Sequence, residues 1–316
     1  MKIAHPYMNR RFFLGGTLAL GAGACIPPDQ SPLGRLAAEL RIIEAAGGGT
    51  LGVEIFNTAT GASVGINQDR RFGHASSFKL SLAALLLQRH AAGTIDADKR
   101  VTWTEADMLS HAPFTRERIA SGATLRELAR ATQTTSDNPA ANILLRNLGG
   151  PAGLTAFWRS LGDEVSRVDR YEPEMNLVMA TEFRDTTTPA AMARTVAKIV
   201  YGDVLPEKER AELKGWMIET QTGLKRVRAG LPEGWVAGDK TGTSGLVGAA
   251  DYNYIDIGFA EGPKGEGPLT FACYLRARQT EDDMLPGPQA ALAEVGRIIK
   301  EFAEPERGLP LVGKLY

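Results

Sequence analysis

The spacing of apolar positions changes twice near the start of the chain. Between Ser31 and Gly47 the apolar residues stand three or four apart, which predicts a helix that Ser31 caps and glycine ends. Over residues 51–55 apolar residues alternate with Gly and Glu, and residues 60–61 offer a turn before residues 62–66. We therefore expect a helix followed by a β-hairpin.

From Ser76 to about residue 217 the pattern is mostly helical, with Leu and Ala concentrated over residues 78–90. Residues 162–185 show no sustained period, so we expect a long loop there, which in a compact domain is more typical of function than of filler. Later helices begin at a capping box or at a proline in the first turn, at positions 124–127, 138–139, 151, 188–189 and 206.

Extended segments return near the end of the chain, and an amphipathic helix follows them; the predicted strands cover residues 236–243, 252–260 and 269–276. Two strands at the front and three at the back imply one sheet, built from both chain ends around an inserted helical domain. The fold class is therefore α/β (α+β). The predicted boundaries are 25–67 with 218–316 for the α/β domain, and 68–217 for the all-helical domain.

The composition is that of an ordinary globular protein. The 316 residues are 43% hydrophobic and 23% charged, which excludes collagen-like, low-complexity and disordered classes. A net charge of -1 gives no reason to expect a nucleic-acid partner. Four His and two Cys leave little with which to build a zinc site, so we expect no metal and no cofactor.

The first 24 residues differ from the rest, because they carry basic residues, no acid and then an apolar run. This pattern predicts an export signal peptide. Arg10-Arg11 before residues 12–14 resembles the twin-arginine (Tat) signal, which exports folded proteins; a plain Sec signal is the alternative. The apolar run is too short to span a bilayer. We therefore expect a periplasmic protein, with a monomer as the default.

The chain has two cysteines, Cys25 and Cys273, and the first bears on whether the mature protein is anchored to a membrane. The small residues 22–24 fit a cleavage site, but Cys25 directly after them could be a lipidated lipoprotein cysteine. Ala22 stands where such a site usually has Leu, so a free mature protein and a lipid-anchored one both stay open. Cys273 lies in the apolar run 269–275, which predicts a buried and inert thiol.

The first chemical motif is Ser76-Ser77-Phe78-Lys79, an S-x-x-K sequence at a predicted helix start. Residues three apart share a helix face, so Lys79 can approach the Ser76 hydroxyl and, with a lowered pKa, take its proton. The positive end of the helix dipole would help to stabilise a developing oxyanion. Alone the motif is weak, since about one would occur by chance in a chain of this size.

Two more motifs follow, Ser136-Asp137-Asn138 at a helix junction and Lys240-Thr241-Gly242 on a predicted strand. Separately they fit a capping turn and a basic strand end. Together, S-x-x-K, S-D-N and K-T-G in this order are typical of class A β-lactamases and penicillin-binding proteins. From about residue 31 to 305 the chain resembles the serine penicillin-recognising enzymes. The resemblance implies a five-stranded antiparallel sheet flanked by helices, with an inserted helical domain.

Within that superfamily the loop at about 163–185 decides the class. Arg170-Tyr171-Glu172-Pro173-Glu174-Met175-Asn176 is similar to the omega-loop motif of class A β-lactamases, with Met175 in place of the usual Leu. The resemblance implies that Glu172 and Asn176 hold the hydrolytic water, and that Arg170 and Asp185 form the ion pair at the neck of the loop. It also implies a possible cis peptide at Glu172-Pro173.

The implied activity is serine β-lactamase, which opens the amide of penicillins and cephalosporins through an acyl-enzyme and so confers antibiotic resistance. Ser76 would attack, and the backbone N–H groups of Ser76 and Thr243 would form the oxyanion hole. Ser136 would relay a proton to the departing nitrogen, with Lys79 and Lys240 polarising the relay. Whether Lys79 or the loop acid is the base for acylation stays open.

The same resemblance implies the substrate contacts. Asn138 would hold the side-chain amide, and the carboxylate would meet Lys240, Thr241, Gly242 and Thr243. Many relatives place an arginine after K-T-G.

This chain has Ala249 at that position. In other relatives a different position substitutes for that arginine, and it falls on Arg226 here, so the resemblance implies that Arg226 helps to bind the carboxylate, with Arg276 and Arg278 as further candidates. We expect Arg228 to serve structure.

His111 falls where relatives often have an aromatic residue at the rim. Ala75 and Ser244 exclude the disulfide that some carbapenem-hydrolysing relatives form at these positions.

Two rival functions fit parts of the pattern. A D-alanyl-D-alanine carboxypeptidase or other penicillin-binding protein shares the three polar motifs, but Glu172 and Asn176 weigh against it. A non-catalytic penicillin-binding sensor or lipoprotein would need a transmembrane helix or the loss of a polar group, and the sequence indicates neither. The motifs do not fix which β-lactams are preferred.

Overall fold

The computed structural model describes residues 31–179, 181–247 and 251–303. The predicted leader, Cys25 and Ala249 therefore lie outside the described residues. Within the described ranges, no helix combines the length and apolarity that a membrane span requires.

The front of the chain folds as the periodicity predicts. Helix α1 covers Pro32–Ala46, and the Ser31 side chain accepts a hydrogen bond from the Gly34 N–H at 3.0 Å. Strands β1 (Gly49–Asn57) and β2 (Ser63–Ile66) then form the antiparallel hairpin. The prediction of a capped helix and a hairpin is confirmed.

One five-stranded sheet joins the two ends of the chain. Strands β7 (Val236–Val247), β8 (Asp251–Glu261) and β9 (Leu269–Arg278) complete it, in the order β2-β1-β9-β8-β7. Every neighbouring pair is antiparallel, and β1 pairs with β9 along its whole length. The predicted fold class is confirmed. Strand β7 is an edge strand, which leaves one side of it open to a ligand.

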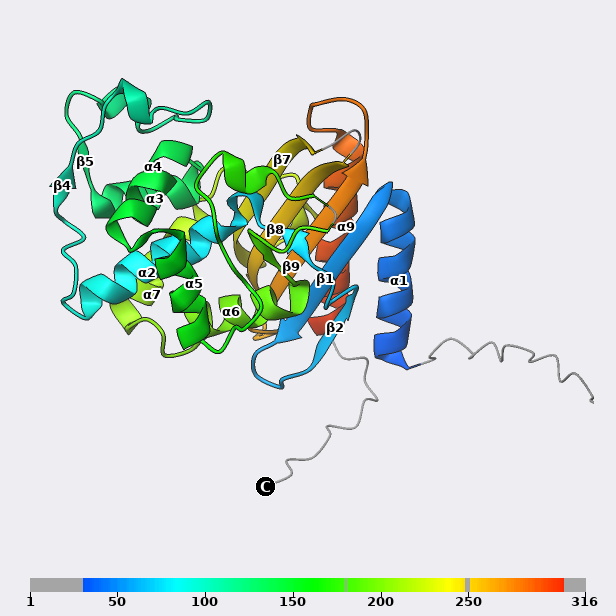
Figure 1. Ribbon diagram of the computed structural model, residues 1–316. Helices are drawn as coiled ribbons and strands as arrows, with labels where there is room; N and C mark the ends of the chain where they lie inside the picture. Colours follow the sequence, from blue (N-terminus) through cyan, green and yellow to red (C-terminus); the bar gives the residue numbers. More distant parts are fainter. Residues whose placement is uncertain (1–30, 180, 248–250, 304–316) are drawn as a thin grey trace, which may run out of the picture.

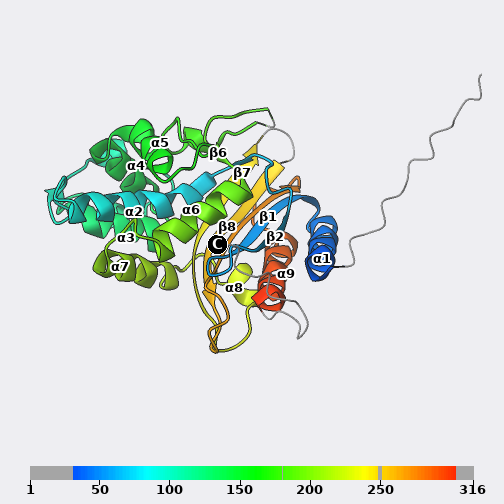
Figure 2. The same cartoon turned by 90° about the horizontal axis from the view of Figure 1, so that it is seen from below.

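Helices cover both faces of the sheet (Figure 1, Figure 2). On one face lie α1, the closing helix α9 (Pro286–Ala303) and the short α8 (Val227–Gly230), which the sequence did not predict. On the other face lies the helical region, with α6 packed against the sheet; its helices are α2 (Phe78–Ala91), α3 (Leu125–Thr134), α4 (Asn138–Asn147), α5 (Gly150–Ser160), α6 (Pro189–Tyr201) and α7 (Glu207–Ile218). The domain boundaries given above stay a prediction.

Helix α2 runs through the middle of the helical region, and every residue from Phe78 to Leu87 is buried. Apart from Lys79 and Ser81, this buried stretch is apolar, as is typical of a helix segment enclosed by others. Its first turn carries the S-x-x-K motif, so the nucleophile candidate stands on a rigid element. The predicted capping box at Thr124 and Glu127 starts α3.

Two-residue ladders and short 3-10 turns were missed by sequence reasoning, because they are too short to show a period. The ladders are β3 (Phe72–Gly73) with β6 (Thr186–Thr187), and β4 (Arg100–Val101) with β5 (Ala123–Thr124). The β3–β6 ladder matters for the site, since it joins the segment before Ser76 to the end of the long loop. The 3-10 turns are Ala75–Ser77, Glu105–Asp107, Arg116–Arg118 and Glu174–Asn176.

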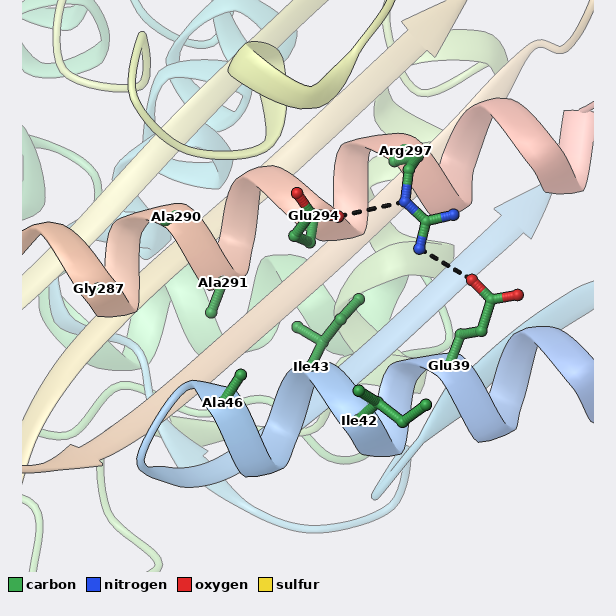
Figure 3. Close-up of a pocket in the computed structure, with 9 residues that line it drawn as sticks. All are labelled: Glu39, Ile42, Ile43, Ala46, Gly287, Ala290, Ala291, Glu294 and Arg297. Atoms are coloured by element: carbon green, nitrogen blue, oxygen red, sulfur yellow. Dashed lines mark hydrogen bonds and ion pairs between the residues drawn. The ribbon is translucent and has the colours of Figure 1, made fainter.

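A hollow of about 330 Å³ lies between α1 and α9 (Figure 3). Its floor is apolar, with Ile43 and Ala291 among the lining residues, and the Arg297 guanidinium closes one end by pairing with Glu39 at 2.8 Å and Glu294 at 3.1 Å. None of the predicted site residues lines it. It therefore belongs to the packing of the two outer helices.

Candidate active site

The four motifs converge at the open side of β7, although more than 160 residues separate the first from the last. Ser76 lies in the 3-10 turn that leads into α2, and Lys79 in the first turn of that helix. Ser136 lies in the α3–α4 connection, Glu172 comes from the long loop, and Lys240 comes from β7. Helix, loop and strand thus each supply one part.

Lys79 is the hub of the cluster. Its Nζ donates to Ser76 Oγ at 2.8 Å and to the Ser136 backbone oxygen at 3.0 Å, and it also contacts Asn138 Oδ1. The same Nζ forms an ion pair with Glu172 Oε1 at 3.2 Å, with both side chains fully buried. One ammonium therefore touches all the candidate reacting groups of the helical side.

Ser136 Oγ lies between two lysines, 3.4 Å from Lys79 Nζ and 3.1 Å from Lys240 Nζ. Burial lowers the pKa of Lys79, and the charge of Glu172 opposes this effect. Burial, with the nearby charge of Lys79, lowers the pKa of Lys240 well below its usual value. A lysine with a lowered pKa exchanges a proton more readily near neutral pH, so the pair can move protons through the Ser136 hydroxyl.

Glu172 is held inside the protein, with only 3% of its surface exposed. Its Oε2 accepts a hydrogen bond from Asn176 Nδ2 at 2.6 Å. Asn142 of α4 clamps its backbone, because the Asn142 side chain accepts from the Glu172 N–H at 3.0 Å and donates to the Glu172 oxygen at 2.8 Å. The Glu172-Pro173 peptide is cis, as expected. The carboxylate therefore faces the Lys79 ammonium and not bulk solvent.

The neck of the loop is closed as expected. Arg170 Nε pairs with Asp185 Oδ2 at 2.5 Å. Asp185 Oδ1 also accepts the backbone N–H groups of Asp169 at 2.7 Å and Arg170 at 3.0 Å. With the β3–β6 ladder alongside, these contacts fix the base of the loop that carries Glu172.

Two residues at the reacting serines have a left-handed backbone conformation. Ala75, directly before Ser76, has φ 39°, and Ser136 itself has φ 63°. For non-glycine residues such conformations are unfavourable in free energy, and they persist only when the surrounding structure enforces them. Here the carbonyl of His74 accepts hydrogen bonds from the Ser77 N–H at 3.0 Å and the Ser77 hydroxyl at 2.8 Å. The turn that carries the Ser76 hydroxyl is thus strained but supported, and the Ser136 backbone oxygen is held by the hydrogen bond from Lys79.

Gly242 explains how β7 comes so close to Ser76. A Cβ at this position would lie 2.9 Å from the His74 oxygen and 3.1 Å from the Ser77 nitrogen. Only glycine lets the strand reach the turn that carries the nucleophile. Thr243, the next residue, is thereby brought alongside that turn.

Thr241 and Thr243 each have a side-chain partner at the strand edge. Thr241 Oγ1 lies 2.6 Å from Thr222 Oγ1, and the Arg226 guanidinium donates to Thr243 Oγ1 at 2.6 Å. Arg226 is 2% exposed and also donates to the backbone oxygens of Gly242 at 2.9 Å and Ile255 at 2.6 Å. The structure therefore places Arg226 behind Thr243, beside the expected carboxylate position.

Arg228 plays the structural part predicted for it. It makes two hydrogen bonds to the buried Asp239 carboxylate, at 2.7 and 2.8 Å, and two more to backbone oxygens at the end of α7. His111 is exposed; its ring contacts the Thr135 oxygen at 2.8 Å, and its own backbone oxygen accepts the Asn138 N–H at 2.9 Å. His111 thus lies at the rim beside Asn138.

Sequence reasoning missed Asn142, which supports the site, and the long-range contacts of Asp137. The Asp137 carboxylate caps α4 at the Ala140 N–H and also accepts the N–H groups of Phe114 and Thr115, each at 2.9 Å. The capping interpretation of Asp137 was thus also correct. No local signal could have revealed the long-range contacts. Cys273, in contrast, is the buried free thiol that was predicted, and burial raises its pKa.

His74 lies two residues before the nucleophile, fully buried and stacked on Trp158 with the ring centres 4.9 Å apart. Burial lowers the pKa of His74 from 6.5 to about 4. Between about pH 4 and pH 6.5 the ring is therefore neutral in the folded protein but protonated in the unfolded chain. We expect the free energy of unfolding to fall as the pH drops from about 6.5 to about 4, by about 3 kcal/mol in all from this group.

Urea unfolding between about pH 7 and pH 4.5 measures this dependence. His74→Met keeps an apolar side chain against Trp158 and should flatten the curve in this window. His90→Met, which removes a half-buried histidine at the end of α2, is the matched control and should keep the slope. Identical slopes in wild type and His74→Met would show that His74 does not cause the acid sensitivity.

Within the described ranges, no group of three or more His, Cys, Asp or Glu side chains is placed to hold a metal ion. The chemistry available to the cluster is that of a serine, two lysines and a carboxylate. This combination suits covalent acyl transfer.

Comparison with known proteins agrees with this geometry. Residues 35–303 match the model of the β-lactamase enzyme family. β-Lactamase FAR-1 of Nocardia farcinica (strain IFM 10152) is 44% identical over 262 residues, which are 83% of this chain and 81% of that protein. β-Lactamase L2 of Stenotrophomonas maltophilia is 41% identical over 280 residues, 89% of each chain.

Solved structures point the same way. An ancestral class A β-lactamase matches with a TM-score of 0.79 and 43% identity, over 84% of this chain and 99% of that one. A β-lactamase from Streptosporangium roseum matches with a TM-score of 0.79 and 37% identity, over 85% and 98%. Family model, relatives and fold agree over nearly all of the described residues. The chain belongs to the family of class A serine β-lactamases.

Proposed function

We propose that this chain hydrolyses the β-lactam amide of penicillins and cephalosporins through an acyl-enzyme on Ser76, which water activated by Glu172 then hydrolyses. A bacterium that makes the protein would thereby gain resistance to these antibiotics. The observation that carries the proposal is the ion pair of the fully buried Glu172 carboxylate with Lys79, the same ammonium that donates to Ser76 Oγ.

In the acylation step, Ser76 Oγ attacks the lactam carbonyl and its proton passes to the pair formed by Lys79 and Glu172. The oxyanion accepts hydrogen bonds from the backbone N–H groups of Ser76 and Thr243. As the C–N bond breaks, the nitrogen receives a proton through the Ser136 hydroxyl. The 3.4 and 3.1 Å contacts of Ser136 Oγ with the two lysines support this relay.

The carboxylate of the substrate is assigned to the end of β7. Lys240 supplies a charge there, and the hydroxyls of Thr241 and Thr243 supply donors, with the Gly242 backbone bringing them within reach. Arg226 adds a second charge through its hydrogen bond to Thr243.

On the helical side of the site, Asn138 is assigned to the side-chain amide of the substrate, and His111 to the edge of the site. The described contacts of both residues are compatible with these roles.

In the deacylation step, Glu172 accepts a proton from water, and the resulting hydroxide attacks the ester carbon. The tetrahedral intermediate then collapses with cleavage of the bond from the carbonyl carbon to Ser76 Oγ, and the proton held by Glu172 passes to that oxygen, which restores the Ser76 hydroxyl and the Glu172 carboxylate. A positioned general base of this kind contributes about 10²–10⁴-fold to the rate. Asn176, bonded to Glu172 Oε2, would fix both the base and the water.

The cell location is also part of the proposal. The twin-arginine-like leader would export the folded protein to the periplasm, where β-lactams meet their targets. Either cleavage after Ala24 releases a free monomer, or lipidation of Cys25 anchors it to the membrane surface.

Nitrocefin turnover by the purified protein tests the function. We expect steady hydrolysis over many cycles, measured by the colour change that accompanies opening of the lactam. A single stoichiometric burst, with the acyl group derived from nitrocefin persisting on Ser76 in intact-mass spectra, would instead indicate a penicillin-binding protein of the carboxypeptidase type. No reaction and no adduct would indicate a non-catalytic binding protein.

A further inference from the structure

The connection between β9 and α9, residues 279–285, is pinned to the sheet beside the site. The buried Tyr254 hydroxyl donates to Gln279 Oε1 and accepts the Leu285 N–H, each at 2.8 Å. Gln279 Nε2 in turn donates to the backbone oxygens of Glu281 at 2.6 Å and Asp283 at 2.8 Å. Hydrogen bonds at both ends thus hold this connection in one position.

Met284 is the residue of this connection that reaches the site. Its Sδ lies 3.7 Å from the Arg226 guanidinium and 4.0 Å from Thr243 Oγ1. Met284 is nevertheless 49% exposed, so part of this residue faces solvent. An exposed apolar group therefore borders the two residues to which the proposed function assigns the carboxylate.

The chemistry of the substrates says what should meet this group. In a cephalosporin, the ring carbon that bears the carboxylate is bonded to the carbon that bears the C3 substituent. In a penicillin, the corresponding neighbour carries two methyl groups. A carboxylate placed against Thr243 and Arg226 therefore brings this neighbouring substituent within reach of Met284, whose flexible, polarisable side chain suits apolar groups of varied shape.

We propose that Met284 is a specificity-determining residue, which contacts the substituent next to the substrate carboxylate and favours substrates in which that substituent is large and apolar. The inference rests on the proposed function, since it takes the carboxylate position from it. Met284 lies outside the three polar motifs, and the part of the substrate that it contacts is the substituent next to the carboxylate.

Two cephalosporins with the same C7 side chain test the proposal, one with hydrogen at C3 and one with a large apolar C3 group. The quantity measured is the kcat/KM for the cephalosporin with the large C3 group divided by the kcat/KM for the one with hydrogen at C3. We expect Met284→Ala to lower this ratio by about tenfold, because an apolar contact is lost for one substrate only. Met284→Leu, of similar volume, should keep the ratio within about twofold. Met284→Gln, of similar length but polar, should lower it.

Val236→Ala is the matched control, since Val236 is a 46% exposed apolar residue at the far end of β7. It should leave the ratio unchanged. If Met284→Ala and Met284→Gln keep the wild-type ratio, or if Val236→Ala lowers it equally, the assignment of Met284 is overturned. If the wild-type protein hydrolyses neither of the two cephalosporins, the proposed function is overturned instead.

Discussion

Glu172→Ala is expected to turn the protein from one that releases its product into one that keeps it. The substitution removes the carboxylate that would take a proton from water, while Ser76, Ser136 and both lysines remain. Acylation can then proceed, but the ester on Ser76 has no positioned base. We expect the deacylation rate to fall about 10²–10⁴-fold, the range typical for loss of a general base.

Intact-mass spectrometry and stopped-flow nitrocefin assays measure this change together. After mixing with a penicillin, the spectrum should show a penicilloyl adduct that persists, and the nitrocefin assay should show a burst of about one equivalent per enzyme and then slow turnover. Wild type should show neither, because its acyl-enzyme is short-lived under the proposed mechanism.

Glu174→Ala is the matched control. Glu174 lies two residues along the same loop but is exposed to solvent, so its loss should leave turnover near the wild-type level. Wild-type turnover by Glu172→Ala would contradict the assignment of the base. Loss of acylation as well as deacylation would indicate that the ion pair with Lys79 is needed for the first step too.

The sequence alone predicted the parts of the site that local rules govern. Three-residue spacing on a helix places Lys79 beside Ser76, and the observed 2.8 Å contact follows from that spacing. The alternation over residues 51–55 and the proline at 189 likewise lead directly to β1 and α6. Such features depend on neighbours along the chain, so no knowledge of the tertiary structure was required.

The remaining parts depend on contacts between distant segments. Nothing near Asn142 in the sequence indicates that its amide holds the Glu172 backbone, which is 30 residues away. The position of Arg226 behind Thr243 and the sulfur of Met284 beside it are equally invisible, because three separate segments create them. A motif therefore identified the reacting groups, while the groups that orient them emerged only with the packed structure.

Ser76→Ala is expected to have the largest effect of all, a loss of about 10⁶-fold in kcat, because no acyl-enzyme can form without the hydroxyl oxygen. The covalent adduct should vanish as well, both in Ser76→Ala and in the double variant that also carries Glu172→Ala.

Ser81→Ala is the matched control: Ser81 is buried one turn further along α2, and its hydroxyl has no hydrogen-bond partner among the described residues, so its loss should spare turnover. Lys79 would keep its contacts with Ser136, Asn138 and Glu172 in Ser76→Ala, so the site should stay intact and still bind penicillin reversibly. Hydrolysis that survives in this variant at more than about one part in 10³ of the wild-type rate would mean that water, or another nucleophile, attacks the lactam directly, and the acyl-enzyme would then be no part of the reaction.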